Sequence, residues 1–87
     1  MADLYIYACP MQMINFQIVT FDGEVTNSIS NINCIFGDII KTASKCLKEQ
    51  TISNIFIVGN TAFADKIETI MNKEFNKQVN VERIQNG

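Results

Sequence analysis

The turn Gly59-Asn60-Thr61 is the stretch of this sequence whose residue types and spacing best suit binding chemistry. It joins an apolar run to a segment with helical spacing, and N–H groups at a helix start attract anions because the helix dipole is positive there. Parallel sheets also bind ligands beyond the carboxyl ends of their strands, where Cys9 and Pro10 are expected. The alternative is that Gly59 only permits a tight turn and that Asn60 or Thr61 caps the helix. The predicted site for a small anion or nucleotide consists of Cys9, Pro10, Gly59, Asn60 and Thr61.

The chain lacks the combinations of residues that catalysis by a thiol or a carboxylate pair requires. Cys9 would need a neighbouring His or cation to become a thiolate, and the sequence contains no His. Asp65 and Glu68 share a helix face at i and i+3. The helix dipole explains an acidic residue in a first turn, and solvation explains Glu68. We therefore predict that the protein is not an enzyme.

Composition argues against metal and nucleic-acid binding. Cys9, Cys34 and Cys46 are odd in number, lie among apolar residues and lack CxxC spacing, which is typical of reduced, buried thiols and not of zinc sites. We predict no metal and no cofactor. A net charge of −2 and a pI near 4.9 give no electrostatic footprint for a nucleic-acid backbone.

The length of 87 residues, of which 47% are hydrophobic, predicts one domain over residues 1–87. No basic segment leads the first apolar run, so no signal peptide is predicted. No run approaches the roughly 18 apolar residues of a membrane span, and the expected location is the cytoplasm. Abundant Ile, Asn and Lys are typical of AT-rich coding, as in many low-GC bacteria and their phages.

Hydrophobic periodicity predicts seven elements. Residues 4–9 are apolar on both faces, as in a strand covered on both sides of a sheet, and residues 13–21 alternate like a half-buried strand. Asp22-Gly23 indicates a hairpin turn into a weak edge strand over residues 25–29. Amphipathic spacing predicts helices over residues 36–47 and 61–76. Strands are predicted over 53–58 and 78–84.

The order strand-strand-strand-helix-strand-helix-strand predicts an α/β fold on the border of α+β. Right-handed crossovers favour a five-stranded mixed sheet of order 3-2-1-4-5 with two helices packed on it. The succession resembles the ribonuclease H-like core. The stretch "IFIVGNTAFADKIETIMNKEF" is similar to the strand, glycine turn and helix that carry the adenosine-binding motif in the actin, heat-shock chaperone and sugar-kinase group of that superfamily.

This resemblance implies chemistry for which the residues are missing. Nucleases of the superfamily hold two metal ions with an Asp in the first strand and a carboxylate after the fourth, where this chain has Tyr5-Ile6-Tyr7 and Gly59-Asn60. The actin-like ATPases have a Gly- and Thr-rich hairpin after the first strand and a second domain over the nucleotide. This chain has "ACPMQM" and room for one domain.

The predicted function is therefore a small, non-catalytic protein-interaction module, plausibly of a phage or mobile element, that binds a host protein or forms a homodimer. Two helices are few to cover both sheet faces, and Met is common on adaptable binding surfaces. Equally, the termini or a helix could shield the uncovered apolar residues. The alternatives are a small-ligand binder at the glycine turn and a degenerate nuclease. The predicted interface residues are Tyr5, Tyr7, Met11, Met13, Val19 and Phe21.

Overall fold

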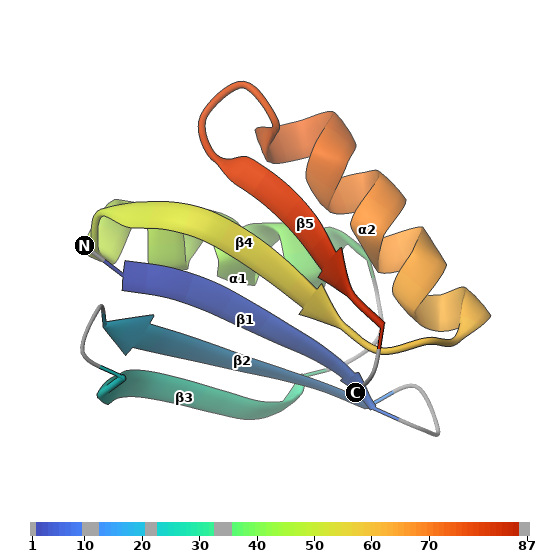
Figure 1. Ribbon diagram of the computed structural model, residues 1–87, viewed down its shortest axis with the longest axis horizontal. Coiled ribbons are helices and arrows are strands. Elements are labelled where there is room, and N and C mark those ends of the chain that lie inside the picture. The colour runs from blue at the N-terminus through green and yellow to red at the C-terminus, as the bar shows by residue number, and fades with distance from the viewer. Residues whose placement is uncertain (1, 10–12, 21–22, 33–35, 86–87) are drawn as a thin grey trace.

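The computed structural model describes residues 2–9, 13–20, 23–32 and 36–85, and these residues form one sheet and two helices (Figure 1). The α/β class is confirmed. The strands are β1 (Ala2–Cys9), β2 (Met13–Thr20), β3 (Val25–Ile32), β4 (Ile52–Val58) and β5 (Asn80–Ile84), and the helices are α1 (Phe36–Glu49) and α2 (Ala62–Phe75).

The strand order in the sheet is β3-β2-β1-β4-β5. β1 pairs antiparallel with β2, and β2 pairs antiparallel with β3. β1, β4 and β5 are mutually parallel. α1 connects β3 to β4 across β2 and β1, and α2 connects β4 to its neighbour β5. Two right-handed crossovers that proceed in the same direction place both helices on the same face of the sheet. Figure 1 shows α1 passing behind the sheet and α2 lying along β5.

The hydrophobic core lies between the sheet and these helices. Alternate residues of β1 face it, and the register sets Leu4 beside Ile55 and Ile6 beside Ile57. All four of these side chains are fully buried, as expected for period-2 patterning against a helix layer. The helices complete the core with Ile39, Ala43 and Cys46 from α1 and with Ala64, Ile67, Met71 and Phe75 from α2.

The expectation that β1 is covered on both sides is wrong. Tyr5 and Tyr7 alternate with the buried residues of β1 and are only half-buried, because both helices pack on the opposite face. Apolar residues on both faces of a strand indicate two buried faces only if enough elements exist to cover them. Within the described residues, this sheet has one helix layer.

Several element boundaries also need correction. β3 extends to Ile32 and not 29, because its pairing with β2 continues to Ile14 opposite Ile32, past two irregularities in register. β5 begins at Asn80 and not 78, because the N–H groups of Gln78 and Val79 both donate to the Phe75 carbonyl in the turn after α2. The predicted hairpin residue Gly23 has φ of +90°, and residues 21–22 lie outside the described ranges.

Candidate functional site

The face of the sheet opposite the helices, called the open face below, carries three parallel rows of side chains across β1, β4 and β5. Cross-strand neighbours share a face of a sheet, and the register therefore defines the rows. The first row is polar, the second combines aromatic residues with one carboxylate, and the third is apolar. The rows are Asp3-Asn54-Asn80, Tyr5-Phe56-Glu82 and Tyr7-Val58-Ile84.

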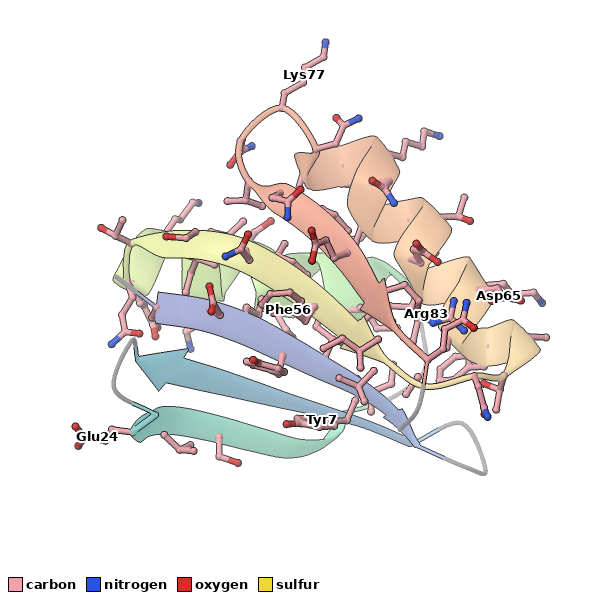
Figure 2. All side chains as sticks on the ribbon, viewed as in Figure 1. Tyr7, Glu24, Phe56, Asp65, Lys77 and Arg83 are labelled. Carbon is pink, nitrogen blue, oxygen red and sulfur yellow. The ribbon has the colours of Figure 1, made fainter. Side chains whose placement is uncertain are left out.

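An aromatic cluster occupies the middle of the open face. The ring centroids of Tyr5 and Phe56 lie 5.1 Å apart, and those of Tyr5 and Tyr7 lie 6.1 Å apart with an interplanar angle of 19°. All three side chains are half-buried. Figure 2 shows Tyr7 and Phe56 on the side of the sheet away from α1. The cluster thus presents aromatic surface that neither helix covers, which is the arrangement typical of a binding surface.

The polar row lies at the amino ends of the three parallel strands. The Asn54 Nδ2 donates to Asp3 Oδ1 at 2.9 Å, and the Asn80 Nδ2 donates to Asn54 Oδ1 at 3.1 Å. Along the row, the Asn54 amide both donates and accepts, and the Asn80 amide donates. The row therefore forms a chain of hydrogen bonds across three strands and bounds the aromatic cluster on one side.

Burial raises the pKa of Tyr7 above the ordinary value of 10.0, and the nearby Tyr5 raises it further. Because the chain has two tyrosines, Tyr5→Phe leaves Tyr7 as the only phenol. We expect ultraviolet titration of this variant to give a midpoint above 10. Since the folded pKa is raised, the neutral phenol contributes stability that is present below the unfolded pKa and is lost as the pH rises through the folded pKa. A midpoint at or below 10 would contradict the burial of this ring.

The β4–α2 turn brings together some of the predicted ligand residues. A Cβ built on Gly59 would lie 3.1 Å from the Ala8 carbonyl oxygen, which confirms that the carboxyl ends of β1 and β4 adjoin. The Gly59 N–H donates to the Ile84 carbonyl at 2.9 Å. Thr61 is the N-cap of α2, and its hydroxyl accepts from the Ala64 N–H at 3.2 Å. These groups are engaged within the fold, and ligand binding at this turn stays a prediction.

Arg83 of β5 connects this turn to the first turns of α2, an arrangement that the sequence analysis missed (Figure 2). Its Nε donates to the Gly59 carbonyl at 2.7 Å, and one terminal nitrogen donates to Asp65 Oδ1 at 2.7 Å and to Glu68 Oε1 at 3.0 Å. The Arg83 side chain is 8% exposed. Burial lowers the pKa of Arg83, but the hydrogen bonds that it donates to Asp65 and Glu68, together with the negative charges of these carboxylates, outweigh burial and raise the pKa.

The explanation of Asp65 by the helix dipole alone and of Glu68 by solvation alone therefore needs correction. Both carboxylates bind the same guanidinium, because α2 packs beside β5. The two carboxylates also place negative charge next to the turn, which disfavours an anion at the predicted ligand site.

The structure describes the remaining predicted ligand and interface residues to different extents. Pro10, Met11 and Phe21 lie outside the described residues. Cys9, Met13 and Val19 are described as backbone positions only: Cys9 pairs with Met13 at one end of the β1–β2 ladder, and Val19 pairs with Asp3. Asn60 is exposed at the turn.

Cys46 is the cysteine for which a buried, free thiol is confirmed. Burial raises the pKa of its thiol, with a further contribution from Glu49, so the reactive thiolate is disfavoured.

Among the described residues, no group of three or more Cys, Asp or Glu gathers around a possible metal position. In the same part of the chain, neither helix has the length and apolar character needed to cross a membrane.

No protein-family model matches the sequence, and no curated protein sequence matches it. Among solved structures, the fold is similar to that of a ROK family protein from Streptococcus pneumoniae TIGR4 in complex with sucrose. The TM-score is 0.66 at 19% identity, and the match covers 98% of this chain and 34% of that chain. This likeness is consistent with an actin-like, ribonuclease H-like core. At 19% identity, this likeness shows the fold alone. The chain spans about a third of the length of this neighbour.

Proposed function

We propose that this chain is a non-catalytic protein-interaction module and that the open face is its binding surface. The observation that carries the proposal is the aromatic cluster of Tyr5, Tyr7 and Phe56 on a face that neither helix covers. Covering apolar and aromatic surface is favourable at roughly 25 cal/mol per Å². Aromatic residues, Tyr in particular, are also enriched among the residues that dominate binding energy.

The internal hydrogen bonds of the β4–α2 turn support a non-catalytic role. Gly59, Thr61 and Arg83 are engaged with neighbouring elements, and two carboxylates border the turn. The open face is the surface of the described residues where the aromatic side chains of Tyr5, Tyr7 and Phe56 gather. The proposal keeps Tyr5 and Tyr7 from the predicted interface and adds Phe56.

A selection from a displayed library of folded peptides tests the proposal. The bait is the immobilised chain, and the open-face variant is Tyr7→Thr/Phe56→Thr, which keeps residues that suit strands. Ile70→Ala on α2 is the matched control, because it removes apolar surface from the helix layer. We expect binders of the wild-type chain to lose at least about tenfold in affinity for the open-face variant, since truncating a hot-spot residue costs ~2 kcal/mol or more. Thermal melts establish that each variant is folded.

Two results would contradict the proposal. Binders that recognise the wild-type chain and the open-face variant equally well place the binding surface elsewhere. A selection that enriches no binder to the wild-type chain removes the support for an interaction surface on this face.

A further inference from the structure

The basic residues of this chain lie on or near its helix layer, whereas acidic residues occur in both layers. The first 40 residues contain no Lys or Arg, so β1, β2 and β3 contribute no positive charge to the sheet. Arg83 lies in β5, but it binds Asp65 and Glu68 of α2 on the helix side. The other basic residues lie on the helices or in the turn after α2: Lys41, Lys45, Lys48, Lys66, Lys73 and Lys77.

The charged residues in the three rows of the open face are all acidic. Asp3 lies in the polar row, and Glu82 is exposed beside Phe56 in the middle row. No position of the three rows holds a basic residue. The surface is therefore an aromatic patch with two carboxylates next to it. Such a patch favours an apolar partner with Lys or Arg side chains, which can pair with the carboxylates and also lie against the tyrosine rings.

The dimensions of the rows suit a single helix. Three strands at about 4.8 Å spacing are about 14 Å wide, and the distance from the first row to the third is about 13 Å. An α-helix is about 10–12 Å in diameter and covers that distance with about nine residues. A helix on this face would also complete the helix-sheet-helix layering that is common in α/β folds.

A second copy of this chain fits the open face poorly. Face-to-face packing would bring the Asp3 and Glu82 carboxylates of both copies into one interface, where like charges are costly. The basic residues of α1 belong to a helix whose apolar side already packs in its own core. The negative charge likewise disfavours nucleic acids and anionic membranes.

We propose that the partner of the open face is a basic amphipathic helix of another protein, seated on the Tyr5-Tyr7-Phe56 cluster with its Lys or Arg side chains near Asp3 and Glu82. This inference rests on the proposed function, since it specifies the partner of the same surface.

Two synthetic helical peptides test the charge preference. They share one apolar stripe at i, i+3, i+4 and i+7, and the flanking positions are Lys in one peptide and Glu in the other. We expect fluorescence anisotropy at low salt to show at least about fivefold tighter binding of the Lys peptide, because exposed ion pairs contribute modestly. The preference should shrink in 0.5 M salt, where charges are screened.

The variant Asp3→Asn/Glu82→Gln tests whether these two carboxylates are responsible. Asn at position 3 keeps an oxygen that can accept from Asn54, and so the polar row is retained. Asp38→Asn/Glu74→Gln is the matched control, because it makes the same change in net charge on the two helices. We expect the first variant to lose most of the preference for Lys and the control to keep it.

The outcomes separate this inference from the proposed function. Equal binding of both peptides, abolished by Tyr7→Thr/Phe56→Thr, overturns the charge preference and leaves the interaction surface standing. If neither peptide binds but the library yields binders of the open face, the basic helix is overturned as the partner. If light scattering shows a dimer and Tyr7→Thr/Phe56→Thr dissociates it, the open face binds a second copy of this chain. This result also overturns the basic helix as the partner. Binding of neither peptide and no library binder removes both proposals.

Discussion

Replacing Gly59 with alanine is expected to lower the free energy of unfolding by about 2–6 kcal/mol. Gly59 has φ of +148°, a conformation that residues with a Cβ rarely adopt, and such strain costs of order 1–3 kcal/mol. The added Cβ would also lie 3.1 Å from the Ala8 carbonyl oxygen and 3.2 Å from the Ala64 Cβ. Overpacking of this kind costs ~1–3 kcal/mol more. Chemical denaturation followed by circular dichroism measures the change.

Gly37→Ala is the control for this prediction. Gly37 lies in α1, a Cβ there would meet no atom within 4 Å, and alanine favours helix. Its free energy of unfolding should stay unchanged or rise by up to about 1 kcal/mol. A Gly59→Ala protein as stable as the wild type would show that β1, β4 and α2 can separate at this junction, contrary to the tight packing described.

Replacing Arg83 with methionine is expected to lower the free energy of unfolding by about 2–3 kcal/mol. Removing one partner of a buried ion pair typically costs ~3–5 kcal/mol, but here Asp65 and Glu68 are 69% and 34% exposed and can turn to water. The loss therefore falls at or below the lower end of that range. The Gly59 carbonyl also loses the Arg83 Nε as a donor. The comparison is a urea titration of both proteins.

Lys73→Met is the matched control, because Lys73 is exposed on the same helix. Its effect should lie within about 0.5 kcal/mol, as is usual for surface positions. If Arg83→Met were as mild as Lys73→Met, the three hydrogen bonds of Arg83 would contribute nothing net, and the account of how β5 is held to α2 would be wrong.

The sequence predicts the α/β class and the seven elements because their signals are local. Period 2 in β1 and the 3.6 period in the two helices follow from which side chains face the core. The ends of β3 and β5 depend on non-local pairing: a polar segment becomes part of a strand when its neighbour continues the ladder, as Ile14 does for Ile32. Amino-acid composition does not reveal this pairing, and the edge strand predicted over residues 25–29 is therefore shorter than β3.

The candidate site was predictable in part. Tyr5 and Tyr7 share one side of β1 by alternation alone, but which face the helices leave uncovered follows from the direction of both crossovers. Phe56 joins them only through the register of β4 against β1. Arg83 was missed because its carboxylate partners are 15 and 18 residues away in the chain. No spacing rule links them, and α2 must first pack beside β5.

The hydrogen-bonded row Asp3-Asn54-Asn80 also discriminates against strand slippage. A shift of β4 by two residues would keep Ile55 and Ile57 on the core side, so hydrophobic patterning alone does not prevent it. Such a shift would move Asn54 away from Asp3 and Asn80 and would break both side-chain hydrogen bonds, at roughly 0.5–1.5 kcal/mol each. Asn54 thus specifies one alignment of the three parallel strands among those that the core would tolerate.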